Sequence, residues 1–331
     1  MTPSSPLQDS TPCILRLRDA KLIPLITDTA LTSGRPTYNP SIAQFRGRKY
    51  VSVRSSNFIL QPRIGTFKGV HKQLKLKEDD HFFYSETFIL ELDAENRILD
   101  CSPLVFDENV PQWIFAGLED VRLVAWDDRL FALGNRRDHN PLGESRMELY
   151  AIAKSKAAGT WRAQSKYPLS PPESYWQKVE KNWSPINERP FQFVRWTFPT
   201  ELVDLDLTNG CCQMNAIESV SIENYGNLRG GSQVVKLNEK NWISIVHEAI
   251  ANSDSMGNTS FSYVHRIVNW NEDMTIKEVS RPFNFMGGQV EFCAGLIIER
   301  GSLIASIGFE DSSAYLVSFK LDEFIKMGWF N

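Results

Sequence analysis

Short apolar runs with alternating polar positions recur along the whole chain. Their spacing is typical of β-strands that have one buried face. The clearest runs are Tyr50–Val53, Thr87–Leu92, Leu130–Leu133, Trp242–Val246 and Leu303–Ile307. Residues suited to tight turns lie beside or between such runs: Gly47, Asp127-Asp128, Asn209-Gly210, Asn238-Glu239 and Arg300-Gly301. The pattern predicts antiparallel strands joined by hairpin turns.

Helical periodicity is sparse by comparison. Only Ser170 to Lys181 and Leu321 to Met327 are predicted as short helices, and Lys68 to Asp80 is charged without a sustained apolar stripe. Polar loops at about Ile64–His81 and Lys166–Lys181 are expected to decorate one domain rather than to link two. The sequence therefore predicts an all-β protein with short helical decorations.

A degenerate repeat runs through the strands. A Gly- or Pro-containing approach leads into a strand, a turn and a second strand with a polar end, about five times along the chain. This spacing predicts a five-bladed β-propeller with about four antiparallel strands in each blade, although periodicity alone also permits a pair of β-sandwiches. We expect an N-terminal extension and lead-in strand over 1–33, the propeller over 34–320, and a closing helix and tail over 321–331.

Composition narrows the class of partner. The 331 residues are 42% hydrophobic and carry a formal net charge of −4, so the overall charge suggests neither nucleic acid nor an anionic membrane. We find no apolar run long enough for a membrane span and no secretion signal in Met1–Thr11, and we expect a cytoplasmic protein. The five cysteines contain no Cys-x-x-Cys pair, which indicates neither a disulfide framework nor a zinc site.

The strongest chemical signal is Glu119-Asp120-Val121-Arg122, which lies directly before an apolar strand. Two carboxylates beside a guanidinium can tune each other's proton affinity, although a surface ion pair in a turn is the simpler interpretation. In a propeller, polar strand ends from distant segments meet at one channel. Residues expected there are Arg54, Asp120, Arg122, Arg136, Lys181, Arg229, His247, His265 and Asp311. A cationic rim around a few carboxylates suits an anionic substrate group.

An ordered set of motifs carries a family resemblance. It comprises Tyr38-Asn39-Pro40-Ser41, Gly117 to Arg122, Lys181-Asn182-Trp183-Ser184-Pro185, Trp242 to His247, Val290-Glu291-Phe292 and Gly308-Phe309-Glu310-Asp311. Between residues 34 and 320 the chain resembles the five-bladed propeller β-mannoside phosphorylases and glycosidases and the related β-1,2-mannosyltransferases. The resemblance implies an inverting reaction at a sugar anomeric carbon, with Asp120 as the catalytic carboxylate.

Further roles follow from the same resemblance. It implies phosphate or donor binding by Arg54, Arg122, Lys181, Arg229 and His247, with Arg122 also positioning Asp120. It implies sugar binding by Asn39, Glu119, Trp183, His265, Glu291 and Asp311. From the residues alone, core packing explains Trp183 better than sugar stacking does. His247 is equally explained by a core or rim position, and the functional case for His265 is weaker. Glu291 and Asp311 could as easily be charges at strand ends.

Departures from the family pattern guide the choice of reaction. Val121 replaces a proline, and Leu228 to Ser232 replaces a Gly-Pro-Pro type segment, which favours a glycosyltransferase over a phosphorylase. A hydrolase and a non-catalytic sugar-binding propeller remain alternatives. We expect a sugar or sugar-nucleotide substrate, with inorganic phosphate as the alternative reactant. We expect no cofactor and no metal, because Asp204-Leu205-Asp206 fits an exposed strand edge better than a metal site.

Overall fold

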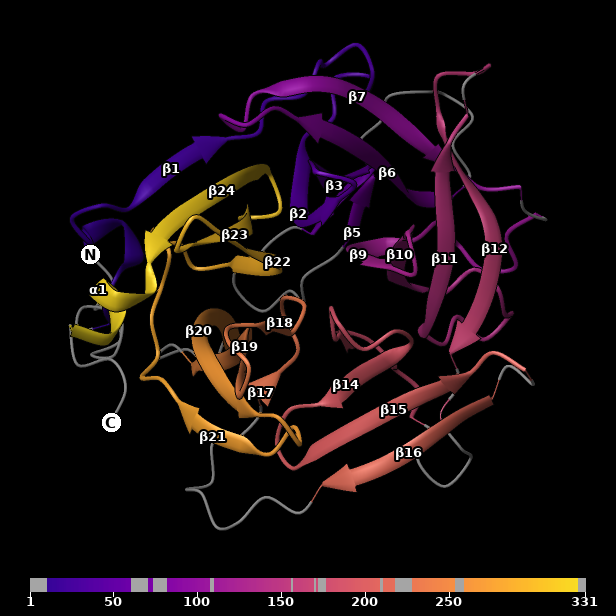
Figure 1. The fold of residues 1–331 in the computed structure, drawn as a ribbon. Helices are drawn as coiled ribbons and strands as arrows, with labels where there is room; N and C mark the ends of the chain where they lie inside the picture. Colours follow the sequence, from indigo (N-terminus) through magenta and orange to yellow (C-terminus); the bar gives the residue numbers. More distant parts are fainter. Residues whose placement is uncertain are drawn as a thin grey trace.

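The structure is almost entirely β (Figure 1). It is a computed structural model, and it describes residues 11–60, 71–73, 82–107, 110–155, 157–169, 171, 177–208, 211–217, 228–253 and 259–326. Most described strands fall into five antiparallel groups of four, and Figure 1 shows these groups following one another around a common centre.

The first two groups are joined at their outer edges. The first comprises β2 (Thr37–Phe45), β3 (Arg48–Ser56), β6 (Phe83–Leu92) and β7 (Ile98–Val105). The second comprises β9 (Glu119–Trp126), β10 (Arg129–Arg136), β11 (Arg146–Lys154) and β12 (Trp161–Leu169). A short parallel pairing of β7 with β12 links the outer strands of the two groups.

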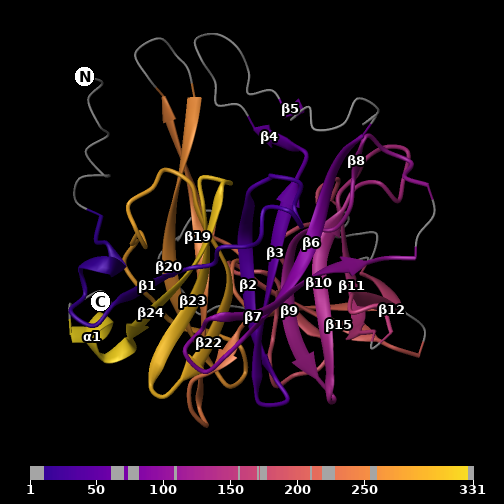
Figure 2. The same cartoon turned by 90° about the horizontal axis from the view of Figure 1, so that it is seen from above.

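The third and fourth groups follow in chain order. The third comprises β13 (Ser184–Pro185), β14 (Gln192–Trp196), β15 (Thr200–Asp206) and β16 (Cys211–Ile217). The fourth comprises β17 (Leu228–Arg229), β19 (Asn241–Ser253), β20 (Thr259–Asn271) and β21 (Ile276–Val279), with β18 (Val235–Lys236) also paired to β19. The β19–β20 hairpin extends beyond its neighbours in Figure 2.

The last group joins the two ends of the chain. It comprises β22 (Glu291–Glu299), β23 (Ser302–Phe309), β24 (Ser313–Lys320) and, from the N-terminal region, β1 (Lys21–Pro24), which pairs with β24. The remaining elements are the 3-10 turn η1 (Ile14–Arg16), the helix α1 (Leu321–Lys326), and the short strands β4 (Phe58–Leu60), β5 (His71–Gln73) and β8 (Phe115–Ala116). The β1–β24 pairing ties residues that are far apart in sequence into a nearly closed ring of strands.

The predicted strands and turns are largely confirmed. All five apolar runs lie in strands, namely β3, β6, β10, β19 and β23. Left-handed backbone at Asp127-Asp128 and Arg300-Gly301 forms two of the predicted hairpin turns. The C-terminal helix is present, whereas residues 177–181 of the predicted Ser170–Lys181 helix are not helical. The rest of that segment apart from residue 171, most of Lys68–Asp80, and Asn209-Gly210 lie outside the described residues.

Apolar clusters lie between successive groups of strands. Ile243, Ile245 and Ile267 of the fourth group, for example, share a cluster with Leu296 and Leu303 of the fifth. Four further clusters fill the other four junctions around the ring. Because each group buries both faces against its neighbours, the inner strands are fixed relative to one another.

Gln233 links the inner strands near the centre. Its Nε2 donates to the carbonyl oxygens of Ile42 (2.8 Å) and Leu123 (2.6 Å), and its Oε1 accepts from the backbone N–H of Leu296 (2.8 Å). These partners lie on β2, β9 and β22, so one buried amide ties three groups to the segment between β17 and β18. Among the described helices, none has the length and apolar character required to cross a membrane.

Candidate active site

The two predicted acids meet Arg54 at the start of β9. Arg54 Nη2 lies 3.0 Å from Glu119 Oε1, and Arg54 Nη1 lies 3.0 Å from Asp120 Oδ1. Asn39 Nδ2 donates to the same Asp120 oxygen at 2.9 Å. Residues from β2, β3 and β9 therefore converge on one carboxylate, as the motif order predicted.

The backbone around Asp120 is tightly constrained. Asp120 and Asn39 both have left-handed backbone, with φ of 51° and 47°, which Asp and Asn tolerate better than most residues. Gly117 has φ of 96°, and a Cβ there would lie 2.1 Å from the Ser85 carbonyl oxygen. Only glycine fits this approach to Asp120, since any side chain would collide with the backbone of β6.

Buried Arg122 joins this segment to the next two groups of strands. Its guanidinium donates to the carbonyl oxygens of Asp120 (3.1 Å) and Gly231 (2.7 Å) and to Asn182 Oδ1 (3.3 Å). Burial lowers the pKa of Arg122 to about 10, against the opposing charge of Asp120. Arg122 thus holds the backbone of Asp120.

Asp120 is held ionised. Burial alone would raise its pKa, but the charge of Arg54, the hydrogen bonds from Asn39 and Arg54, and the charge of Arg122 outweigh burial and lower the pKa below its usual value. A carboxylate that stays ionised can accept a proton from a reacting hydroxyl.

Three cations near these acids have no ion-pair partner within the described part of the chain. They are Arg137, Lys181 and Arg229, which we call the open cations. The Nε atoms of Arg137 and Arg229 are buried and find no hydrogen-bond partner among the described residues. Partial loss of hydration, with the charges of Arg229 and Arg137, lowers the pKa of Lys181 against the attraction of Asp120 and Glu119. Mutually repelling cations with unused donors can attract and bind an anion.

The sequence pattern predicted that Arg136 would face the centre, and it gave no prediction for Arg137. Arg136 is buried and makes a bidentate pair with Asp138, with Nε–Oδ1 of 2.9 Å and Nη2–Oδ2 of 2.6 Å. The period-2 pattern of an extended chain could have indicated that Arg136 pairs with Asp138. Residues two apart share one side of such a chain, and Arg137 faces the other side.

His247 lies beside the open cations and is neutral. It pairs with Arg229 across β17 and β19, and its ring packs against Tyr263 and Phe292, with ring centres 5.3 and 5.2 Å away. Burial, with the charges of His265, Arg122, Arg229 and Lys181, keeps its pKa well below the usual value. His247 can therefore contact a ligand as a neutral imidazole and adds no positive charge.

Asp311 is a second carboxyl near Asp120, and its pKa is raised instead of lowered. It follows β23 in a left-handed conformation, with φ of 48°. Burial raises its pKa against the opposing charge of Arg54, and the charges of Asp120, Glu310 and Glu119 add to the rise. Neighbouring carboxyls with pKa values displaced in opposite directions are typical of sites that move protons.

Three residues predicted to bind sugar lie in the core instead. Trp183 is 0% exposed, packs against Phe193, and donates from Nε1 to Glu180. His265 is 0% exposed among phenylalanine rings. Glu291 is 0% exposed, and its carboxylate accepts backbone N–H groups of the 285–288 loop. Since none has a surface for a sugar, these three predictions are wrong.

Arg54 and Arg122 are also reassigned. Arg54 is neutralised by Glu119 and Asp120, and Arg122 is surrounded by carbonyl groups. Neither is open to an anion in the way that Arg137, Lys181 and Arg229 are. Arg54 instead sets the charge state of Asp120.

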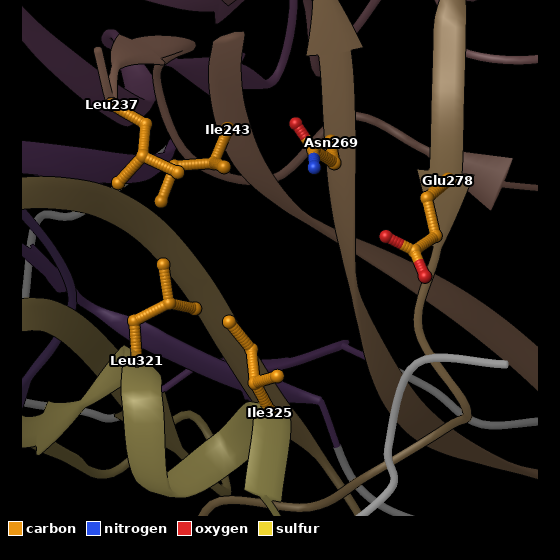
Figure 3. Close-up of a pocket in the computed structure, with 6 residues that line it drawn as sticks. All are labelled: Leu237, Ile243, Asn269, Glu278, Leu321 and Ile325. Atoms are coloured by element: carbon orange, nitrogen blue, oxygen red, sulfur yellow. The ribbon is translucent and has the colours of Figure 1, made fainter.

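A cavity of about 130 Å³ lies away from these residues, between the fourth group and α1 (Figure 3). Its walls are Leu237, Ile243, Asn269, Glu278, Leu321 and Ile325. None of the candidate site residues lines it, and its walls carry one carboxylate, Glu278, and no cation that could bind an anionic sugar derivative.

Comparisons with known proteins address the fold. No family model matches the sequence, and no curated protein matches it. Solved structures do match along most of the chain. β-1,2-Mannobiose phosphorylase from Listeria innocua, in complex with β-1,2-mannobiose, is 14% identical, with a TM-score of 0.56 and coverage of 93% of each chain. This chain shares that fold.

Two proteins from Leishmania mexicana match similarly. MPT-1, a GDP-Man-dependent mannosyltransferase, is 12% identical with a TM-score of 0.55, covering 91% of this chain and 89% of that one. MPT-4, a mannose phosphorylase in complex with a phosphate ion, is 12% identical with a TM-score of 0.53, covering 96% and 92%. The resemblance inferred from the motifs is therefore confirmed at the level of the fold.

Proposed function

We propose that the five groups of strands are the blades of a propeller and that the protein is a carbohydrate-active enzyme. In this proposal it transfers a hexose, mannose or a relative, from a sugar nucleotide to an acceptor hydroxyl with inversion. The observation that carries the proposal is the ionised Asp120 beside three open cations, Arg137, Lys181 and Arg229. The mannose-active proteins that share the fold support the choice of substrate.

The proposed reaction uses these groups in one displacement. The acceptor oxygen attacks the anomeric carbon from the face opposite the leaving group, and Asp120 takes the hydroxyl proton. The bond from the anomeric carbon to the diphosphate breaks, and the nucleoside diphosphate leaves with the electron pair. The open cations meet the charge that develops on it, because an unpaired anion is costly in a partly buried site.

Phosphorolysis is the second candidate, and Asp311 favours it. In phosphorolysis, phosphate attacks the anomeric carbon of a glycoside and the bond to the glycosidic oxygen breaks. A protonated carboxyl must therefore donate a proton to that leaving oxygen. The raised pKa of Asp311 makes it a candidate for that group, whereas the lowered pKa of Asp120 disfavours Asp120 as the acid. The open cations would then hold inorganic phosphate.

Thermal-shift measurements with defined ligands separate these candidates. The protein is scanned with inorganic phosphate, GDP-mannose, GDP alone and mannose at matched ionic strength. Stabilisation by GDP-mannose beyond GDP, with no response to phosphate, is the result expected of the transferase. Stabilisation by phosphate without a response to GDP-mannose would select the phosphorylase. A response to mannose alone would leave a non-catalytic sugar-binding protein.

A further inference from the structure

The Arg136–Asp138 pair is buried, although nothing in the proposed reaction uses its charges. Asp138 is 2% exposed and Arg136 is 4% exposed, and their two parallel hydrogen bonds use both oxygens of the carboxylate. Burying such a pair costs hydration on both sides. The neighbours of the pair indicate a structural role that can offset this cost.

Asp138 contacts the segment that precedes and carries Glu119 and Asp120. The backbone N–H of Gly117 donates to Asp138 Oδ2 at 3.2 Å, and the backbone N–H of Gln112 donates to the Asp138 carbonyl at 2.8 Å. Gly117 lies three residues before Asp120 and already touches the backbone of Ser85. Ser85 Oγ in turn accepts from Arg54 Nε at 3.0 Å.

The pair also flanks Arg137, one of the open cations. Arg137 stands between Arg136 and Asp138 in the chain, so a fixed pair on both sides of it restricts its backbone. Asn135, just before, donates to Glu119 Oε2 at 3.5 Å. One short stretch at the end of β10 thus contacts the acid-bearing segment and also carries Arg137, whose charge acts on Lys181.

We propose that Arg136 and Asp138 are positioning residues that place the Gly117–Asp120 segment and Arg137 relative to each other. They touch no substrate. They couple the proton-accepting half of the site to its anion-binding half through Gly117 and Arg137. Catalytic groups need placement to a fraction of an ångström, and a buried bidentate pair is rigid enough to provide it. This role rests on the proposed function of Asp120 and the open cations.

The test compares Asp138→Asn with a matched control at the other end of the same hairpin. Asp128, in the β9–β10 turn, makes the same bidentate pair with Arg46, with Nε–Oδ1 of 2.8 Å and Nη2–Oδ2 of 2.6 Å. Hydrogen exchange of the peptide around Gly117, the Kd for GDP-mannose and turnover of GDP-mannose are measured for each full-length variant.

For Asp138→Asn we expect at least tenfold faster exchange at Gly117, at least fivefold weaker binding of GDP-mannose and at least tenfold lower kcat. Asp128→Asn should match the wild type in all three. Because Asp138→Asn removes the carboxylate that neutralises a buried arginine, the double variant Arg136→Gln/Asp138→Asn serves if the single variant does not fold. Wild-type exchange at Gly117 in a folded variant would overturn the proposal. Absence of GDP-mannose binding and turnover in the wild type would refute the proposed function, while exchange at Gly117 would still test whether Arg136 and Asp138 hold this segment.

Discussion

Replacement of His265 by phenylalanine should flatten the dependence of stability on pH. His265 is fully buried, neither ring nitrogen has a hydrogen-bond partner among the described residues, and Phe283 and Phe285 lie against the ring. Burial lowers its pKa from 6.5 to about 3. Phenylalanine has nearly the same shape and suits these aromatic neighbours.

The magnitude follows from proton linkage. Above pH 6.5 the imidazole is neutral in both states, so it adds no dependence on pH. Between pH 6.5 and about 3 the unfolded chain binds a proton that the folded protein does not, and stability falls as pH falls. From an unfolded pKa of about 6.5, the loss relative to pH 7 is about 0.7 kcal/mol at pH 6 and about 2 kcal/mol at pH 5.

Urea unfolding followed by tryptophan fluorescence at pH 7, 6 and 5 measures this difference. The free energy of unfolding of His265→Phe should fall by about 2 kcal/mol less than that of the wild type between pH 7 and 5. The other titrating groups are common to both proteins, and their contributions largely cancel because burial is the main cause of the lowered pKa of His247, the group that the charge of His265 affects. Parallel pH profiles would show that His265 is hydrated or paired in the folded protein and would refute its placement in the core.

Two further predictions concern the centre of the ring and the anion site. Gln233→Leu removes the hydrogen bonds that two buried carbonyl groups and one buried N–H make with the Gln233 amide, and should lower the free energy of unfolding by about 3 kcal/mol in urea titrations. An unchanged value would remove Gln233 as a tie between strands. Lys181→Met and Arg229→Met should each weaken phosphate or GDP-mannose binding at least tenfold by calorimetry at low salt, with little change in Tm. Wild-type affinity in both would place the anion elsewhere.

The β character and the hairpins were predictable because they depend on local patterns. Alternation of apolar and polar residues set the strands β3, β6, β10, β19 and β23, and left-handed turn residues such as Asp127-Asp128 set the reversals. The meeting of Arg54 with Asp120 was also predicted, but only from the order of motifs, since 66 positions separate them in the chain.

The predictions that failed concern residues whose position depends on burial and on pairing between distant segments. Trp183 and His265 lie in strands or beside them, where a polar or aromatic side chain can face either the centre of the ring or the core, and only packing decides between these. Glu291 looked like a free carboxylate, but the 285–288 loop folds onto it and uses its oxygens. Arg136 and Arg137 have the same chemistry, and the partner Asp138 determines which of them stays open.

Turnover by Asp120→Asn tests the central claim most directly. The substitution keeps the shape and the contact with Asn39 but removes the proton acceptor. With GDP-mannose and a mannose acceptor, or with phosphate if thermal shift selects it, we expect kcat to fall by at least about a hundredfold. Donor affinity measured on the same sample should change little, since the open cations are untouched. A variant that keeps wild-type turnover would contradict the assignment of Asp120 as the group that moves the proton.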